Sequence, residues 1–255
     1  MSQTTVPPAS RAAVPPRAIV PPRVRAAVLW VAAALATTGL VLIWVARLSA
    51  DRFLYVSELG AAVEPTAEVF RVALACVAAG AALVAVAAPR MSPRTRLLTA
   101  VPPGVVLAVA AVSFGVASQV TCTQYCPLPV GPAFTWQDLI HTVSAVIGFA
   151  GAAFVMLQVA SDTRFRRLAR FSAFSAVSVA VIAGVGGLLS LLRFGTQVGG
   201  VLEFVATTIA LLWLVGLAVL LAVETARSVR PSAGTGQLQP SHPATPDRVA
   251  ATYAE

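Results

Sequence analysis

The sequence predicts an all-α, polytopic membrane protein, a bundle of six transmembrane helices with the N-terminus and the C-terminus cytoplasmic. Three observations support this fold class. Of the 255 residues, 58% are hydrophobic and only 11% are charged, whereas about a quarter are charged in an ordinary soluble domain. The apolar residues fall in continuous runs of about 20, the length that a helix needs to cross a bilayer core. These runs lack the period-two alternation of barrel strands, so helices are expected.

Six such runs follow one another along the chain. The expected spans are 26–45, 69–88, 100–118, 139–160, 171–192 and 202–223. The first has a basic leader, as a signal peptide does, but it is longer than a usual signal-peptide core and lacks a clear small-x-small cleavage site, so a retained helix is expected. Residues 1–25 hold three Pro-Pro pairs and no acid, and residues 226–255 are rich in turn-forming residues. Both tails are therefore expected to be disordered, on either side of a transmembrane domain 26–225.

The arginines predict the orientation. All 18 basic residues are Arg, and most fall in short clusters at 11–25, 90–96, 164–170 and 227–248. Because cytoplasmic loops retain basic residues, these clusters place both termini inside. The basic residues left on the outer side are Arg47, Arg52, Arg71 and Arg193. Clusters beside apolar runs do not make one basic face, so nucleic acid is not an expected partner and membrane lipids are.

Two cysteines lie in the second outer connection, which runs from 119 to 137. On the outer side Cys122 and Cys126 face an oxidising compartment, so a disulfide is expected in preference to free thiols. A metal centre would need further Cys or His in this loop, and the loop has none. No metal or other cofactor is expected, and Cys76 is expected to be a small apolar residue within the second span.

An acid and a histidine stand three residues apart at the start of the fourth span. Thr135 and Asp138 form a T-x-x-D capping-box pattern, in which an acid also favours the positive end of the helix dipole. His141 lies one turn deeper, on a face that continues through small residues. Small residues mark helix–helix contacts, so His141 is expected to point into the bundle, toward Glu203, Glu58 or Arg193.

Two short motifs resemble those of a known family. Residues 55–60 read YVSELG, in an aromatic-rich outer loop after the first span, and residues 138–141 read DLIH at the start of the fourth. This pattern resembles the bacterial six-helix family known as domain-of-unknown-function family 998, over residues 26–224. The resemblance implies a polytopic protein of a bacterial cytoplasmic membrane and brings no established activity.

Several charged residues end or begin spans on the same outer side. If those helices pack together, they form an outer-leaflet polar cluster of Glu58, Arg71, Asp138, His141, Arg193 and Glu203. An ionisable group near a span is costly in lipid, which favours a functional site. The alternative is a rim of caps and ion pairs, because helix ends meet water in any case.

The preferred function is non-enzymatic: binding of a lipid headgroup or small ligand in an outer-leaflet polar pocket, with Arg71 and Arg193 contacting anionic groups. The first alternative is a membrane hydrolase in which Asp138 and His141 hold a metal. Catalytic zinc takes three protein ligands, and the other histidine, His242, lies in the tail. The second alternative, a small-solute or proton-coupled transporter, would usually place charges near mid-membrane. The oligomeric state stays open.

Overall fold

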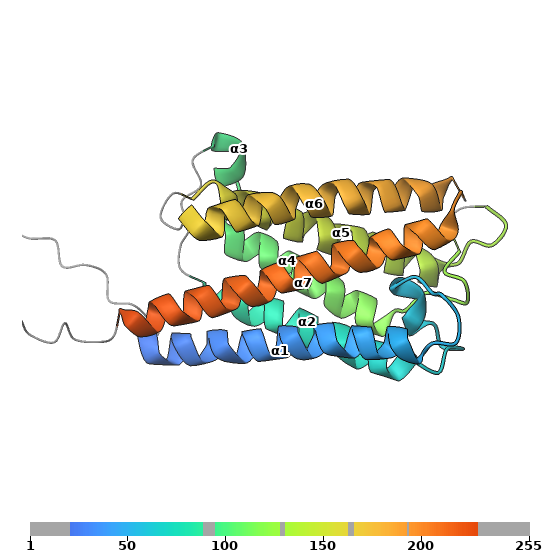
Figure 1. The fold of residues 1–255 in the computed structure, drawn as a ribbon, viewed down its shortest axis with the longest axis horizontal. Coiled ribbons are helices and arrows are strands. Elements are labelled where there is room, and N and C mark those ends of the chain that lie inside the picture. The colour runs from blue at the N-terminus through green and yellow to red at the C-terminus, as the bar shows by residue number, and fades with distance from the viewer. Residues whose placement is uncertain (1–20, 89–94, 128–130, 163–165, 193, 229–255) are drawn as a thin grey trace, which may run out of the picture.

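The computed structural model describes residues 21–88, 95–127, 131–162, 166–192 and 194–228 (Figure 1). Within these ranges the chain is helical and has no strand. Its elements are α1 (Pro22–Ser49), the 3₁₀ helix η1 (Ser57–Gly60), α2 (Ala67–Ala87), α3 (Arg96–Thr99), α4 (Pro103–Gln119), α5 (Trp136–Ala160), α6 (Arg166–Leu191) and α7 (Thr196–Arg227).

The long helices follow the predicted spans in order. In the described part of the chain, five helices are long and apolar enough to cross a membrane, and α4 is a shorter apolar helix. The third span was predicted from residue 100, but α4 begins at Pro103. Proline disfavours helical backbone in the residue before it, so the Pro102-Pro103 pair delays the start.

The first helix starts earlier than predicted. It begins at Pro22, inside the stretch 1–25 that was expected to be a tail. Proline is tolerated at the first helical positions because its missing N–H would have no partner there. The remainder of that tail and most of the C-terminal one lie outside the described residues.

The five long helices and the shorter α4 close into a ring. Each packs on the next long helix along the chain, in the order α1, α2, α4, α5, α6, α7, and α7 packs back on α1. Figure 1 shows the start of α1 and the end of α7 at one end of the bundle, and η1 at the other. We call these the terminal end and the η1 end.

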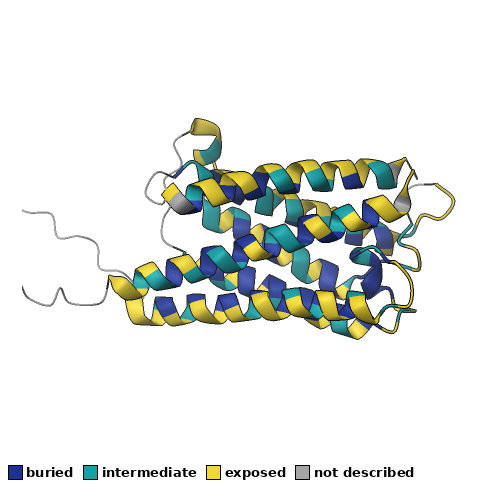
Figure 2. Ribbon diagram, viewed as in Figure 1, coloured by how far each residue is buried: buried dark blue, intermediate teal, exposed yellow. Residues whose placement is uncertain are grey.

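The outward faces of the helices carry apolar side chains. Figure 2 shows exposed residues along these faces and buried residues on the faces turned inward. Large exposed hydrophobic residues recur on every long helix, among them Val41, Val86, Val112, Val146, Phe174 and Leu212. A soluble protein rarely exposes apolar patches on this scale, whereas lipid requires them.

The closest helix packing joins α1 to α2. A Cβ added at Gly39 would lie 2.7 Å from the carbonyl oxygen of Ala73, and one at Gly80 would lie 3.0 Å from that of Ala32. Glycine thus lets the two backbones approach, as small residues do in membrane helix pairs.

Candidate functional site

Asp138 caps α5 and also fixes the preceding loop. Its backbone N–H donates to Thr135 Oγ1 at 3.0 Å, which confirms the predicted cap, and the Thr135 hydroxyl donates to Asp138 Oδ2. The carboxylate further accepts hydrogen bonds from the backbone N–H of Thr123 at 2.7 Å and from the Thr123 hydroxyl at 2.9 Å. The side chain is fully buried. Both carboxylate oxygens are therefore engaged in holding the loop.

His141 points into the bundle, as predicted, and is 3% exposed. Its Nδ1 lies 2.8 Å from the carbonyl oxygen of Val120. A carbonyl can only accept, so Nδ1 carries the hydrogen and the lone pair of the neutral ring is on Nε2. The hydrogen-bond partner of His141 is thus a backbone group of the loop, not Glu203 or Glu58, and Arg193 lies outside the described residues.

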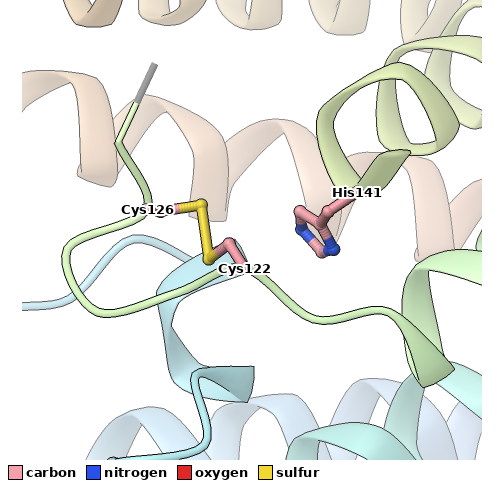
Figure 3. Close-up of side chains that lie close together, drawn as sticks. All are labelled: Cys122, Cys126 and His141. Carbon is pink, nitrogen blue, oxygen red and sulfur yellow. A yellow bond between two sulfur atoms is a disulfide. The ribbon is translucent and has the colours of Figure 1, made fainter. Parts of the chain in front are cut away.

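The imidazole faces two sulfur atoms. Cys122 and Cys126 are joined by a disulfide, as expected, and Figure 3 shows the His141 ring beside it. Cys122 is fully buried, and its Sγ lies 3.3 Å from the carbonyl oxygen of Ser57, so the pair also contacts η1. The loop itself has no histidine, but α5 brings His141 close to the two cysteines from outside the loop.

Glu203 joins α7 to η1. Its carboxylate accepts hydrogen bonds from the backbone N–H of Val56 at 3.1 Å and of Ser57 at 3.3 Å. These are groups at the start of η1 that have no partner within the helix itself. Glu203 therefore holds the first connecting loop against the end of the bundle.

Glu58 is buried beside Arg52, which the sequence predicted only to lie on the outer side. Arg52 donates to Glu58 at 2.8 Å and to Glu64 at 2.7 Å, and its guanidinium lies 5.2 Å from the ring centroid of Tyr125. Hydrogen bonding to Glu58, and then to Glu64, raises the pKa of Arg52. Arg52 thereby links the α1–α2 connection to the α4–α5 connection at the η1 end. Little in the sequence indicates these ion pairs, because Glu58 and Glu64 are 6 and 12 residues from Arg52 in an irregular loop.

Four residues of the predicted polar cluster lie at the η1 end of the bundle. Glu58, Asp138, His141 and Glu203 lie around η1 and the segment 120–126 that follows α4. Arg71 instead pairs with the exposed Glu68 at 2.7 Å, one turn away on α2, an arrangement of the surface type that contributes little. Among the described residues, the Cys, His, Asp and Glu side chains close enough to share an ion are Cys122, Cys126 and His141, without Asp138.

A cavity lies inside the helix ring below this cluster. The cavity has a volume of about 80 Å³. Its lining comes from α1, α2, α4, α5, α7 and η1. The lining runs from residue 70 to 81 on α2, 107 to 117 on α4, 141 to 152 on α5 and 203 to 214 on α7. At a rise of 1.5 Å per residue each stretch is about 16 Å long. The cavity is thus narrow and elongated along the bundle axis.

The two ends of the cavity differ in chemistry. Its ionisable and hydroxyl groups are at the η1 end, namely Ser57, His141, Glu203 and Thr207. Thr207 lies one turn beyond Glu203 on α7. It is 7% exposed, and its Oγ1 has no hydrogen-bond partner among the described residues. Below this level the lining is aliphatic and aromatic.

Loss of Glu203 should release η1. We expect Glu203→Ala to speed amide hydrogen exchange at Val56 and Ser57 about tenfold, since each hydrogen bond contributes about 0.5–1.5 kcal/mol and both amides lose their acceptor. Glu68→Ala, which removes an exposed acid, is the control and should leave both amides unchanged. Equal exchange in Glu203→Ala and the wild type would show that the carboxylate does not hold the loop.

The fold and the site together define the class of protein. It is a polytopic, all-helical protein of membrane type, and its η1 end is closed by a disulfide-bonded loop and by buried carboxylates. The chain belongs to the family described as protein of unknown function (DUF998), whose model matches residues 31–220. The resemblance seen in the motifs at 55–60 and 138–141 is confirmed. Neither the curated proteins nor the solved structures give a match. The function of this family is unknown.

Proposed function

We propose that the chain is a six-span protein of the bacterial cytoplasmic membrane, with both termini inside, and that its cavity holds the chain of a single-chain amphiphile. Its head would lie in the outer leaflet, beside Glu203 and Thr207. The observation that carries this proposal is the elongated cavity, which is apolar along most of its length and polar at one end. Ligand sites between bundle helices commonly combine such a lining with a few polar groups.

Two features support placing the η1 end outside. Described arginines gather at helix ends on the terminal side, namely Arg23, Arg25, Arg96, Arg166, Arg170 and Arg227. Basic residues are retained on the cytoplasmic side. The disulfide lies at the other end of the bundle, and disulfides persist in oxidising compartments. Both features favour the same orientation.

The polar end favours a particular headgroup. Its acidic member is the carboxyl group of Glu203, and Arg71, which was expected to contact anionic groups, pairs with Glu68 away from the cavity. A carboxylate and an unpartnered hydroxyl suit a head that donates hydrogen bonds. We therefore favour a hydroxyl or an ammonium over a phosphate. Thr207 is the residue best placed to gain a partner when the ligand binds.

Filling the cavity should block this ligand. Trp213 lines the cavity and is 1% exposed, whereas Trp30, Trp44 and Trp136 are exposed on the outside. In a background with those three changed to Phe, dodecanol brominated along its chain should quench Trp213 fluorescence on binding. We expect Ala110→Phe to weaken the binding at least about tenfold, which corresponds to about 1.4 kcal/mol.

Matched variants separate the cavity from the lipid-facing surface. Val109→Phe adds bulk on the adjacent, exposed position of α4 and should leave quenching intact. Thr207→Val removes the hydroxyl at similar volume and should weaken binding about threefold to tenfold. Dodecylamine and dodecyl phosphate, added as competitors, test the headgroup, and the phosphate should compete least. Undiminished quenching in Ala110→Phe would contradict the proposal.

A further inference from the structure

A second feature, at the polar end of the cavity, is the group of Cys122, Cys126 and His141, of which His141 also lines the cavity. One ligand atom from each residue lies within 4.8 Å of the others. Cys122 and His141 are buried and Cys126 is partly exposed, at the loop surface. The three residues converge from two separate elements, the loop after α4 and the second turn of α5 (Figure 3).

The loop is fixed to α5 on both sides of Cys122. Two residues earlier, the carbonyl of Val120 accepts the hydrogen bond from His141 Nδ1 at 2.8 Å. One residue later, Thr123 gives its N–H and its hydroxyl to Asp138 at 2.7 and 2.9 Å. The position of Cys122 relative to the imidazole is thus set by hydrogen bonds that do not involve sulfur. It should therefore persist when the disulfide is reduced.

The histidine is prepared for ligation. With Nδ1–H held by a backbone carbonyl, Nε2 keeps its lone pair. Metal-binding histidines almost always donate their other ring N–H to a carbonyl or carboxylate in this way, which fixes the tautomer and the ring orientation. Two thiolates and one imidazole also form a donor set that zinc prefers.

We propose that the reduced chain binds Zn²⁺ through Sγ of Cys122, Sγ of Cys126 and Nε2 of His141, with the fourth position open to water. Zinc–sulfur bonds of about 2.3 Å in tetrahedral geometry place the two sulfurs about 3.8 Å apart. The sulfurs therefore have to separate after reduction, while the whole ligand set already lies within 4.8 Å. The oxidised form offers no thiolate and does not bind the ion.

The two forms interconvert by a balanced exchange. A dithiol donor delivers two electrons and two protons: its first thiolate attacks one cysteine sulfur, the S–S bond breaks, and its second thiol resolves the mixed disulfide. The donor ends as a disulfide and the chain as two thiols. Zinc then displaces both thiol protons to water. The site is thus a cation site controlled by the redox state of the loop.

The test uses the purified full chain in detergent, reduced with a phosphine and desalted without oxygen. Cobalt(II), a coloured substitute for zinc, should give a sulfur-to-cobalt charge-transfer band that saturates at one ion per chain and disappears when Zn²⁺ is added. The unreduced chain should give no band. A reduced wild-type chain without this band would overturn the proposal.

Variants assign the ligands. Cys126→Ser, at the loop surface, should abolish the band, and His141→Ala should weaken cobalt binding at least about tenfold. Cys76→Ser changes the free cysteine in α2 and is the matched control that should bind as the wild type does. Normal binding in Cys126→Ser or in folded His141→Ala would remove that residue from the ligand set and contradict the site. Ala110→Phe should still bind cobalt, so failure of the amphiphile proposal and failure of this one are distinguishable.

Discussion

Asp138→Ala is expected to lower the free energy of unfolding by about 3 kcal/mol or more. The change removes a buried carboxylate that accepts hydrogen bonds from the backbone and the hydroxyl of Thr123 and from the hydroxyl of Thr135. Hydrogen bonds to a charged group contribute about 1.5–3 kcal/mol each, and the N–H of Thr123 loses its partner. Reversible unfolding of the oxidised chain in mixed micelles, followed by circular dichroism, measures the loss.

Two milder variants separate the roles of Asp138. Thr135→Ala removes the N-cap acceptor and should lose about 1 kcal/mol. Asp138→Asn keeps a carbonyl oxygen for the Thr123 N–H and an amide that can donate to the hydroxyls, so its loss should lie between the other two. If Asp138→Ala unfolds like Thr135→Ala, the carboxylate acts only as a helix cap and the connection to Thr123 contributes nothing.

The helical fold follows from features that neighbouring residues share. A run of about 20 apolar residues has to be helical in lipid wherever its partners lie, so order and type of the long helices were predictable. The cap of α5 was equally local, because Thr135 and Asp138 are three residues apart. The disulfide is also local, since its cysteines are separated by four positions.

The candidate site depends on contacts that local patterns do not encode. Glu203 meets Val56 across 147 residues, and His141 meets the carbonyl of Val120 across 21. These contacts depend on how one helix end is aligned with a loop. The order of six helices along the chain does not determine that alignment. The sequence predicted a charged partner for His141, whereas in the structure the imidazole lies beside a backbone carbonyl and two sulfurs.

A polar pocket in the outer leaflet was expected, but the long apolar part of the cavity was not predicted, for a related reason. Five helices, α1, α2, α4, α5 and α7, contribute apolar residues to it, so no single segment differs from an ordinary packed span. Among the lining residues, Thr207 alone has a local indication in the sequence. A hydroxyl one turn beyond Glu203 on an apolar helix has to form a hydrogen bond with another group or with the carbonyl of its own helix. It has no partner among the described residues, which distinguishes it from a packing threonine.

Gly39→Leu is expected to lower the free energy of unfolding by about 3 kcal/mol. In an ordinary helix the change from Gly to Leu is favourable, because glycine is the poorer helix former. At this position the first added atom would lie 2.6 Å from Val77 Cγ2 and 2.7 Å from the carbonyl oxygen of Ala73. The backbone of α2 cannot yield as a side chain can, so α1 has to move away, and overpacking of this kind typically costs 1–3 kcal/mol for smaller additions.

Gly184→Leu is the matched control, because a Cβ at Gly184 on α6 meets nothing within 4 Å and the position is exposed. It should change the stability by less than about 0.5 kcal/mol or increase it. The same micelle unfolding experiment compares the two variants directly. Because the cavity receives residues from both α1 and α2, displacement of α1 should also weaken quenching of Trp213 by the brominated dodecanol. Equal stability of the two leucine variants would mean that α1 and α2 do not pack at backbone contact, and the ring of helices would then have to close in another way.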